Sequence, residues 1–465
     1  MMRTALLILS GNASAAVLLL ARNLVLARLI PVADYGIAAT FAMVMAVIEM
    51  ASNLGLHQQI VQARRGDDPD FQAALQGFQL IRGVIGALAL LAMAGPVAGF
   101  LGIPQAANAY RWLALVPLLN AMQHFDIHRA QRRGRYGPML LTGAVPALGS
   151  LLVIFPLAHL FGDWRVMLWA LLLQAVLGVV TSHLVAERRW HLRFDPAVMA
   201  DAWRFGAPLL VNAVLLYLVF QGDKLIVGRL SGMEALALYA MGVTLTLTPT
   251  LVVAKTTQNM FLPKLSALHG EGQDAAHRDL ARATLEAAMM NGTALVIGMF
   301  VIGAPVVMWL LGAKYATLIP LLVPFAILHA LRVFKSGPSI VALSVGATGN
   351  ALWGNLPRVL ALPIGWWLLE TTGSLQALIW LGVGAELAGF VLSLIRLHGV
   401  VRLPNALPAL AVSMFALLAI SALILLDTAQ SYAVKALIGA TLFALQLMAA
   451  RGLRGYFTTK LMGKV

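Results

Sequence analysis

The sequence predicts an all-α polytopic membrane protein of about 14 transmembrane helices. Hydrophobic residues make up 60% of the 465-residue chain and charged residues only 11%. The mean hydropathy is +0.84, far above that of soluble proteins. Apolar stretches of about 20 residues, enough to cross a bilayer, begin near Ala5, Gly36, Gly77, Tyr110, Met139, Val166, Phe205, Ala235, Leu285, Ala316, Ala351, Leu375, Ala406 and Ala433.

The basic residues predict how the helices are oriented. A net charge of +14 could indicate nucleic acid as a partner. Most Lys and Arg residues, however, lie at one set of alternating helix ends, among them Arg129, Arg132, Lys335 and Arg396. By the positive-inside rule these ends are cytoplasmic. We therefore expect a multi-pass membrane protein with both termini in the cytoplasm and no nucleic-acid partner.

Several short patterns recur about 200 residues apart, which indicates an internal repeat. Asn12-Ala13 returns as Asn212-Ala213, Asn23 corresponds to Asp223, and Arg28-Leu29 returns as Arg229-Leu230. An even number of helices in each copy gives both copies the same orientation, with a pseudo-twofold axis along the membrane normal. The repeat predicts six-helix lobes over residues 1–195 and 196–404, followed by two additional helices and a basic tail over residues 405–465.

The first apolar stretch contains polar residues on one face. Asn12 and Asn23 are 11 positions apart, or about 20° on a helical wheel, and Arg22 is next to Asn23. A charge near the bilayer centre costs from about 2.5 to over 10 kcal/mol, so Arg22 should face protein or a wet cavity.

Other patterns give the chain a family resemblance. They are ArgLeuIleProValAlaAspTyrGly at 28–36, Gly55-Leu56 followed by Ile60-Val61, GlyAspLys at 222–224 with Tyr239, and PheLeuProLysLeuSer at 261–266. Together they resemble the oligosaccharide flippase or polysaccharide transporter branch of the multidrug/oligosaccharidyl-lipid/polysaccharide exporter superfamily. The resemblance implies alternating access between two six-helix lobes. It also implies transport of an undecaprenyl-pyrophosphate-linked oligosaccharide from the cytoplasmic to the periplasmic leaflet.

Such a substrate would require cations along a wet groove. The planar guanidinium of Arg matches phosphate in a bidentate manner and stays charged. The candidate substrate-binding residues are Arg22, Arg28, Arg82, Arg332, Arg358, Asn12 and Asn23. In the alternative interpretation, each arginine extends to the membrane interface or pairs with a carboxylate on a neighbouring helix.

Two carboxylates are candidates for ion coupling or for a gate. Glu49 lies inside the second predicted helix and Asp223 near the end of the seventh. Carboxylates within a membrane can carry H⁺ or coordinate Na⁺. The alternative is an ion pair, which Lys224 next to Asp223 illustrates.

The sequence indicates a transporter that is not an enzyme and needs no cofactor. It contains no nucleotide-binding or hydrolase motif and no cysteine. Isolated His124 and His128, with Asp126 between them, favour surface placement over a metal site. Expected partners are the lipid-linked substrate, the bilayer, a polysaccharide polymerase and glycosyltransferases. Alternative functions are a cation-coupled multidrug antiporter, a membrane-embedded enzyme of polysaccharide assembly, or a scaffold.

Overall fold

The computed structural model describes residues 2–51, 54–401, 406–426 and 431–461. Of these, the side chains of residues 2–13, 51, 208, 209, 211, 212 and 459–461 are not described. The described chain is helical, without strands, and divides into two compact units, Met1–Ala237 (unit 1) and Leu238–Val465 (unit 2). The all-α fold class predicted from the sequence is confirmed.

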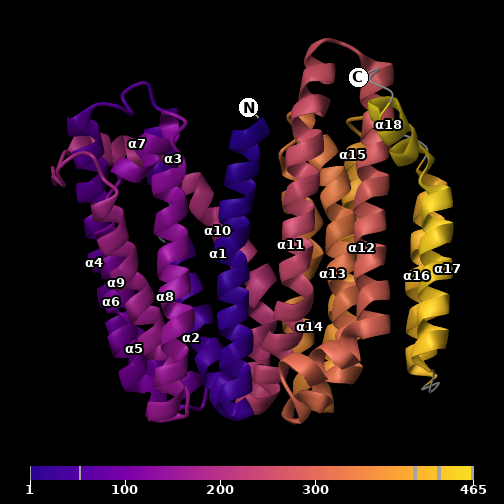
Figure 1. The fold of residues 1–465 in the computed structure, drawn as a ribbon, viewed down its shortest axis with the longest axis horizontal. Coiled ribbons are helices and arrows are strands. Elements are labelled where there is room, and N and C mark those ends of the chain that lie inside the picture. Colours follow the sequence, from indigo (N-terminus) through magenta and orange to yellow (C-terminus); the bar gives the residue numbers. More distant parts are fainter. Residues whose placement is uncertain (1, 52–53, 402–405, 427–430, 462–465) are drawn as a thin grey trace. The chain divides into compact units, whose positions relative to one another are not determined.

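Unit 1 contains eleven helical elements (Figure 1). They are α1 (Met2–Leu29), α2 (Val32–Ala51), α3 (Leu56–Gln62), α4 (Pro69–Phe100), η1 (Pro104–Ala106), α5 (Ala107–Leu113), α6 (Leu115–Ala121), α7 (Asp126–Arg132), α8 (Gly137–Phe161), α9 (Arg165–Leu184) and α10 (Pro196–Leu230).

Helix α11 (Gly232–Gly270) begins in unit 1 and continues into unit 2. The other elements of unit 2 are α12 (Asp274–Leu310), η2 (Ala313–Leu318), α13 (Ile319–Ser344), α14 (Gly349–Thr372), α15 (Leu375–His398), α16 (Leu407–Leu425), α17 (Tyr432–Ala449) and α18 (Arg451–Leu461).

The helix count agrees with the sequence prediction. Within the described residues, 10 helical segments are long and apolar enough to cross a membrane. Helices α1, α10 and α14 and the consecutive pair α5 and α6 occupy the other segments that hydropathy predicts. The protein is therefore a polytopic membrane protein with the predicted arrangement of apolar helices.

Local sequence sets several helix ends. Asp68 and Asp195 each accept hydrogen bonds from backbone N–H groups in the first turn of α4 and α10, and each is followed by proline. This combination of an N-cap carboxylate with proline at the first position favours a helix start. Gly162 and Gly373 end α8 and α14 in the left-handed conformation, with φ of 67° and 62°.

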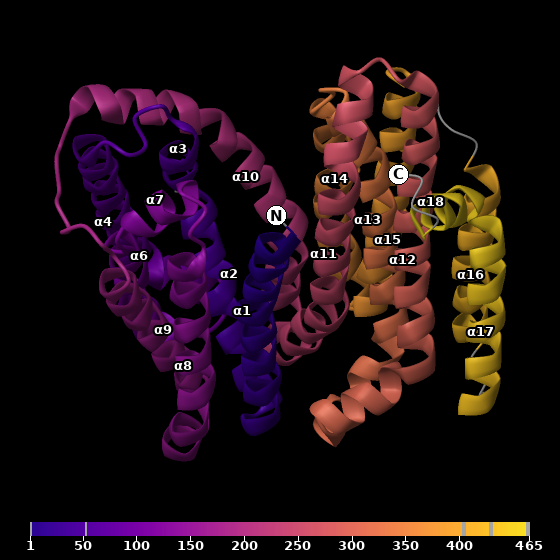
Figure 2. The ribbon, with the colours of Figure 1, turned by 45° about the horizontal axis from the view of Figure 1, so that its top comes forward.

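In unit 1, α1 packs on α8, α8 on α9, and α4 on α5 and α6. Gly83 allows the close contact of α4 with α6, because a Cβ atom there would lie 2.2 Å from the Ala121 Cβ. The long curved helix α10 (Figure 2) packs against α2 and α4. Unit 1 therefore extends beyond residue 195, where the repeat predicts the end of the first lobe. The division into compact units does not test the boundary between the two repeats, which stays a prediction.

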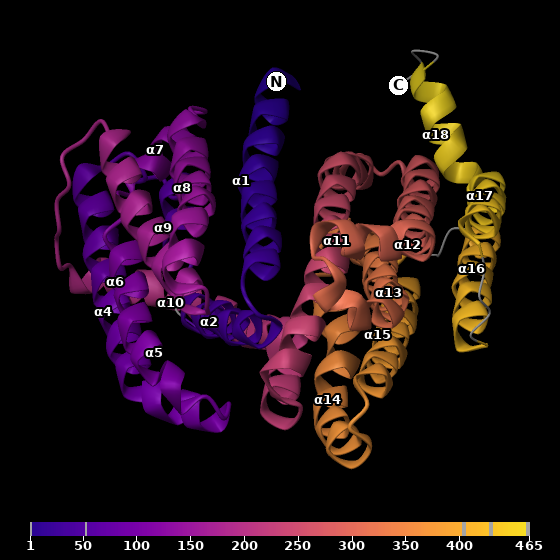
Figure 3. The same cartoon turned by 60° about the horizontal axis from the view of Figure 1, so that its bottom comes forward.

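In unit 2, α13 is the central helix, packed against α12 and α15, and α15 also packs against α14. Phe334 of α13 and Phe390 of α15 meet in the apolar core, their ring centroids 5.9 Å apart. Helices α16 and α17 lie side by side (Figure 1 and Figure 3) and pack on α12. The two predicted C-terminal helices thus add to the core of this unit.

Candidate functional site

A polar cavity lies among the helices of unit 1. Its volume is about 400 Å³. Helices α2, α3, α4, α6, α7 and α9 and the turn between α6 and α7 contribute its polar lining, which consists of Glu49, His57, Gln79, Arg82, Asn120, Gln123, His128 and Gln174. We call this space the polar cavity. This lining includes Arg82 and Glu49, an arginine and a carboxylate that the sequence predicts as site residues.

Arg82 of α4 is half-buried in the cavity wall. Its Nη1 donates a hydrogen bond to Gln79 Oε1 at 2.8 Å. Among the described residues, its Nε atom is buried without a hydrogen-bond partner, and no carboxylate pairs with its side chain. An amide oxygen carries only a partial charge, so the full positive charge of Arg82 is available to a ligand.

Arg22 of α1 reaches the same wall through another glutamine. It is 5% exposed, and its Nη1 donates to Gln174 Oε1 at 2.5 Å. A second contact, Nη2 to Asn23 Oδ1, is 3.5 Å long. Within the described part of the chain, Arg22 Nε also lacks a partner. Arg22 and Arg82 are therefore held by amides rather than by carboxylates.

The remaining predicted residues of unit 1 lie in different surroundings. Arg28 is exposed at the last turn of α1. Asp223 is a buried residue of α10, and Glu49 lines the polar cavity. The side chains of Asn12 and of its repeat counterpart Asn212 lie outside the described residues. Of the predicted set, the structure groups Arg82 and Glu49 at the cavity, with Arg22 and Asn23 behind Gln174.

The uncharged polar residues of this site were not predicted from the sequence. Gln79, Asn120, Gln123 and Gln174 are polar residues inside apolar stretches, and that was the available signal. An amide both donates and accepts hydrogen bonds, so such residues can form hydrogen bonds with an arginine or with a hydroxyl group.

Unit 2 contains a second group of buried charges, which we call the cation cluster. Glu386 of α15 is fully buried. It accepts hydrogen bonds from Arg332 of α13 at 2.5 and 2.9 Å and from Lys335 Nζ at 2.7 Å. Arg358 of α14 approaches the same carboxylate, with its Nε 4.0 Å from Oε1. One carboxylate thus faces three cations.

The position of Lys335 corrects the sequence interpretation, which assigned it to a cytoplasmic helix end. The side chain is instead buried within α13, where Nζ also donates to Gly354 O at 3.1 Å and to Asn355 Oδ1 at 2.8 Å. It is three positions after Arg332, so both side chains lie on one helix face. The sequence could not show that Glu386 lies opposite this face.

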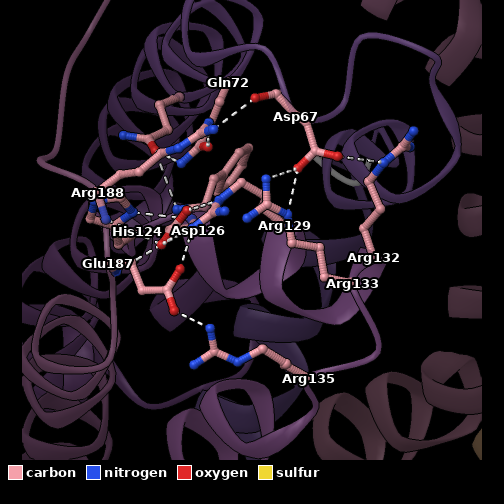
Figure 4. Close-up of polar contacts among 12 residues, drawn as sticks. Asp67, Gln72, His124, Asp126, Arg129, Arg132, Arg133, Arg135, Glu187 and Arg188 are labelled. Atoms are coloured by element: carbon pink, nitrogen blue, oxygen red, sulfur yellow. Dashed lines mark hydrogen bonds and ion pairs between the residues drawn. The ribbon is translucent and has the colours of Figure 1, made fainter.

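A third group of charges holds the segment that follows α9 (Figure 4). Asp126 of α7 pairs with Arg129 and accepts hydrogen bonds from the backbone N–H of Glu187 at 2.8 Å and of Arg188 at 3.3 Å. Glu187 in turn pairs with Arg129 and Arg135. We call Asp126, Arg129, Glu187 and Arg188 the connector network.

The predicted surface placement around α7 was wrong. His124 is 1% and Asp126 2% exposed, and His128 lines the polar cavity. The physical reason is that α7 packs against α3 and α8. Burial by itself would raise the pKa of Asp126, but hydrogen bonds from Arg129 and from the Glu187 backbone hold that pKa below its usual value.

Comparison with known proteins identifies the family. A family model described as "Polysaccharide biosynthesis protein" matches residues 25–320. The chain belongs to this family. A relative in Bacillus subtilis (strain 168), the teichuronic acid biosynthesis protein TuaB, is 24% identical over 234 residues. That match covers 50% of this chain and 48% of TuaB, so it spans about half the length of the relative.

Two solved structures have a similar fold. An inward-facing multidrug resistance MATE transporter of the MOP superfamily has a TM-score of 0.68 at 16% identity, covering 83% of this chain and 95% of that one. The lipid II flippase MurJ, in an inward closed conformation, has a TM-score of 0.66 at 12% identity, covering 98% and 100%. This polysaccharide biosynthesis family member therefore has the MOP transporter fold.

Proposed function

We propose that this protein is a flippase that moves an undecaprenyl-pyrophosphate-linked oligosaccharide from the cytoplasmic to the periplasmic leaflet of a bacterial inner membrane. The observation that carries the proposal is the polar cavity of unit 1, where an amide holds Arg82 and where Gln174 of the cavity wall accepts a hydrogen bond from Arg22 behind it. Its transport would proceed by alternating access with both termini in the cytoplasm, and without chemical conversion of the substrate.

The charge balance of this region favours an anionic substrate. A guanidinium is costly to bury unless an anion or several hydrogen bonds compensate it. Arg82 in the cavity wall and Arg22 behind Gln174 each have a glutamine as a partner and retain a buried Nε without a hydrogen bond among the described residues. A diphosphate would supply the missing acceptors, since its oxygens match the guanidinium fork. Gln79, Asn120 and Gln123 would then face the diphosphate or the first sugar.

The cation cluster of unit 2 contributes to the proposal in a different way. Glu386 neutralises one charge of Arg332, Lys335 and Arg358. We propose that Arg332 and Lys335 hold α13 to α15, and that Arg358, at 4.0 Å from the carboxylate, attracts the anion.

The carboxylates remain the proposed coupling and gate residues. Glu49 is the acidic residue of the polar cavity lining and is therefore our candidate for binding H⁺ or Na⁺. Asp223 on α10 is the candidate gate residue. A polysaccharide polymerase and glycosyltransferases would be partners in the same biosynthetic process.

The alternative, a cation-coupled multidrug antiporter, is less compatible with the cavity. A cationic drug would meet Arg82 at close range, and a single carboxylate lines the described cavity. Electrostatic repulsion would weaken its binding. Resistance to cationic drugs on expression, without any change in surface polysaccharide, would favour the antiporter over the flippase.

Arg22→Ala tests the proposal in cells that lack the native copy. We expect loss of surface polysaccharide and accumulation of the lipid-linked precursor in the cytoplasmic leaflet, with protein abundance unchanged. Arg111→Ala is the matched control, because this exposed arginine of the same unit also donates to a nearby amide, Asn108 Oδ1 at 2.7 Å. Normal polysaccharide in the Arg22 variant would contradict the role of Arg22.

A further inference from the structure

Two histidines face each other at the polar cavity. His57 of α3 and His128 of α7 both line it, and their ring centroids are 5.4 Å apart. Arg82 lines the same cavity from α4. The three side chains thus come from different helices and line one cavity, which contains two titratable imidazoles and an arginine.

One imidazole nitrogen in this pair has no acceptor or donor opposite it. Among the described residues, His128 Nδ1 is buried without a hydrogen-bond partner. A second close histidine pair, His269 and His277 in unit 2, differs in this respect, because His277 Nε2 is 3.1 Å from Ser344 Oγ. A buried polar atom without a partner costs about 1–3 kcal/mol, so the position of His128 is better suited to a ligand than to an empty cavity.

The surroundings keep both histidines neutral while no anion is bound. Burial lowers the pKa of His128 to about 4, the neighbouring His57 adds to this effect, and Gln131 offsets part of it. Burial and the charge of Arg82 also lower the pKa of His57. A phosphate oxygen next to these rings would act in the opposite direction, because a negative charge stabilises imidazolium.

The other charged groups around the pair are few. Glu49 faces the cavity from α2. On α7, Arg132 donates to the backbone carbonyls of Val61 at 2.9 Å and of Ala63, at the end of α3. On α10, which packs against α3, Asp201 and Arg204 are exposed and form an ion pair with each other, with 4.0 Å between Arg204 Nη1 and Asp201 Oδ1. Arg82 lines the same cavity as both histidines, and its charge acts on His57.

We propose that His57 and His128 are proton-dependent ligands of the same phosphate group that Arg82 binds, so that a diphosphate enters the polar cavity together with protons. The inference rests on the proposed function and adds the regulation of its site. Each imidazolium would donate an N–H to a phosphate oxygen, and the two positive charges would lie next to the negative charges of the diphosphate. The protons would leave again when the diphosphate leaves the cavity.

The linkage has a defined sign. A histidine whose pKa is higher in the bound state than in the free state takes up a proton on binding. Binding is then tighter at low pH and weakens as the pH rises through the pKa of the bound state. For one linked proton, the affinity changes roughly tenfold per pH unit between the two pKa values.

Isothermal titration calorimetry on the purified full-length protein measures this linkage. The probe is a short-chain isoprenoid diphosphate sugar. Its diphosphate diester is ionised throughout the range from pH 6 to pH 8, so the probe itself takes up no proton. Titrations in two buffers of different protonation enthalpy give the number of protons taken up. We expect net uptake in the wild type, and uptake near zero in the double variant His57→Gln, His128→Gln.

The control variant is His269→Gln, His398→Gln, which removes two exposed histidines of unit 2 and should leave proton uptake unchanged. Thermal unfolding establishes that each variant is folded. As a second measurement, the dissociation constant of the double cavity variant should equal that of the wild type at pH 8 and lose its dependence on pH.

The outcomes separate this inference from the proposed function. If the probe binds, and Arg82→Gln weakens binding at every pH, but the wild type takes up no protons, the inference is overturned and the flippase proposal stands. Proton uptake that persists in the double variant also overturns it. If the wild type does not bind the probe at any pH, both proposals are wrong.

Discussion

The two units bury the same kind of side chain but surround it differently. In unit 1, Arg22 and Arg82 are bonded to the amides of Gln174 and Gln79. In unit 2, Arg332 and Lys335 are bonded to the carboxylate of Glu386. An arginine paired with a carboxylate mainly holds helices together, whereas one held by amides retains charge for a ligand.

Unit 1 also contains strong ion pairs, but they lie in the connector network. Asp126 and Glu187 pair with Arg129 and Arg135 beside α7 and the segment after α9 (Figure 4). The position of the carboxylates, more than the number of arginines, therefore distinguishes a binding site from a structural contact. Four predictions test this distinction.

The largest effect should follow the loss of the carboxylate of unit 2. Glu386→Gln removes the buried carboxylate charge that Arg332, Lys335 and Arg358 face, and we expect a loss of about 3–5 kcal/mol of stability. Thermal unfolding in detergent measures it. Adding Lys335→Met should restore part of the loss, and Glu370→Gln, an exposed residue of α14, is the control. An unchanged unfolding midpoint in Glu386→Gln would contradict the structural role of the cluster.

The connector network should come next. Asp126→Asn leaves Arg129, 3% exposed, without its buried partner, and we expect a loss of about 3 kcal/mol at pH 7. Because the folded state holds the pKa of Asp126 below its usual value, this stability exists above the ordinary carboxyl pKa of about 3.9. It disappears as the pH falls through the lower pKa of the folded state.

Unfolding midpoints measured between pH 7 and pH 3 check this prediction. The difference between the wild type and the Asp126 variant should begin to narrow below about pH 4. Asp70→Asn is the control, since Asp70 forms an exposed ion pair with Arg193 at 3.0 Å, a type of contact that contributes little. Curves that stay parallel to the lowest pH would show that the carboxylate charge is not the cause.

Arg82→Gln should separate binding from stability. Loss of a hydrogen bond to a charged group costs about 1.5–3 kcal/mol, or roughly 10- to 100-fold in affinity for a diphosphate probe. The unfolding midpoint should stay near that of the wild type, because no carboxylate among the described residues loses its partner. Arg111→Gln is the control. Equal affinity in Arg82→Gln and the wild type would remove Arg82 from the site.

The smallest effect is expected from a neutral partner in unit 2. Asn355→Ala removes one hydrogen bond of Lys335, which keeps its bonds to Glu386 and to Gly354 O. We expect a loss of about 1 kcal/mol. Thermal unfolding of Asn355→Ala beside Glu386→Gln gives the measurement. A loss as large as that in Glu386→Gln would mean that the hydrogen bond from Lys335 to the amide contributes as much stability as the carboxylate does.

The sequence by itself determined the membrane class, the set of apolar helices and the family resemblance. Hydropathy adds up along a continuous segment, so about 20 apolar residues are sufficient to predict a span. It also marked Arg22, Arg82 and Glu49 as unusual, because a charge is rare within such a span.

Only the tertiary structure decided what these residues contact. Lys335 and Glu386 are far apart in the chain and meet because α13 packs on α15. His128 lines the cavity, contrary to the predicted surface placement, because α7 packs against α3. The partner of a charge depends on how helices from distant parts of the chain pack together, and hydropathy and spacing carry little information about that packing.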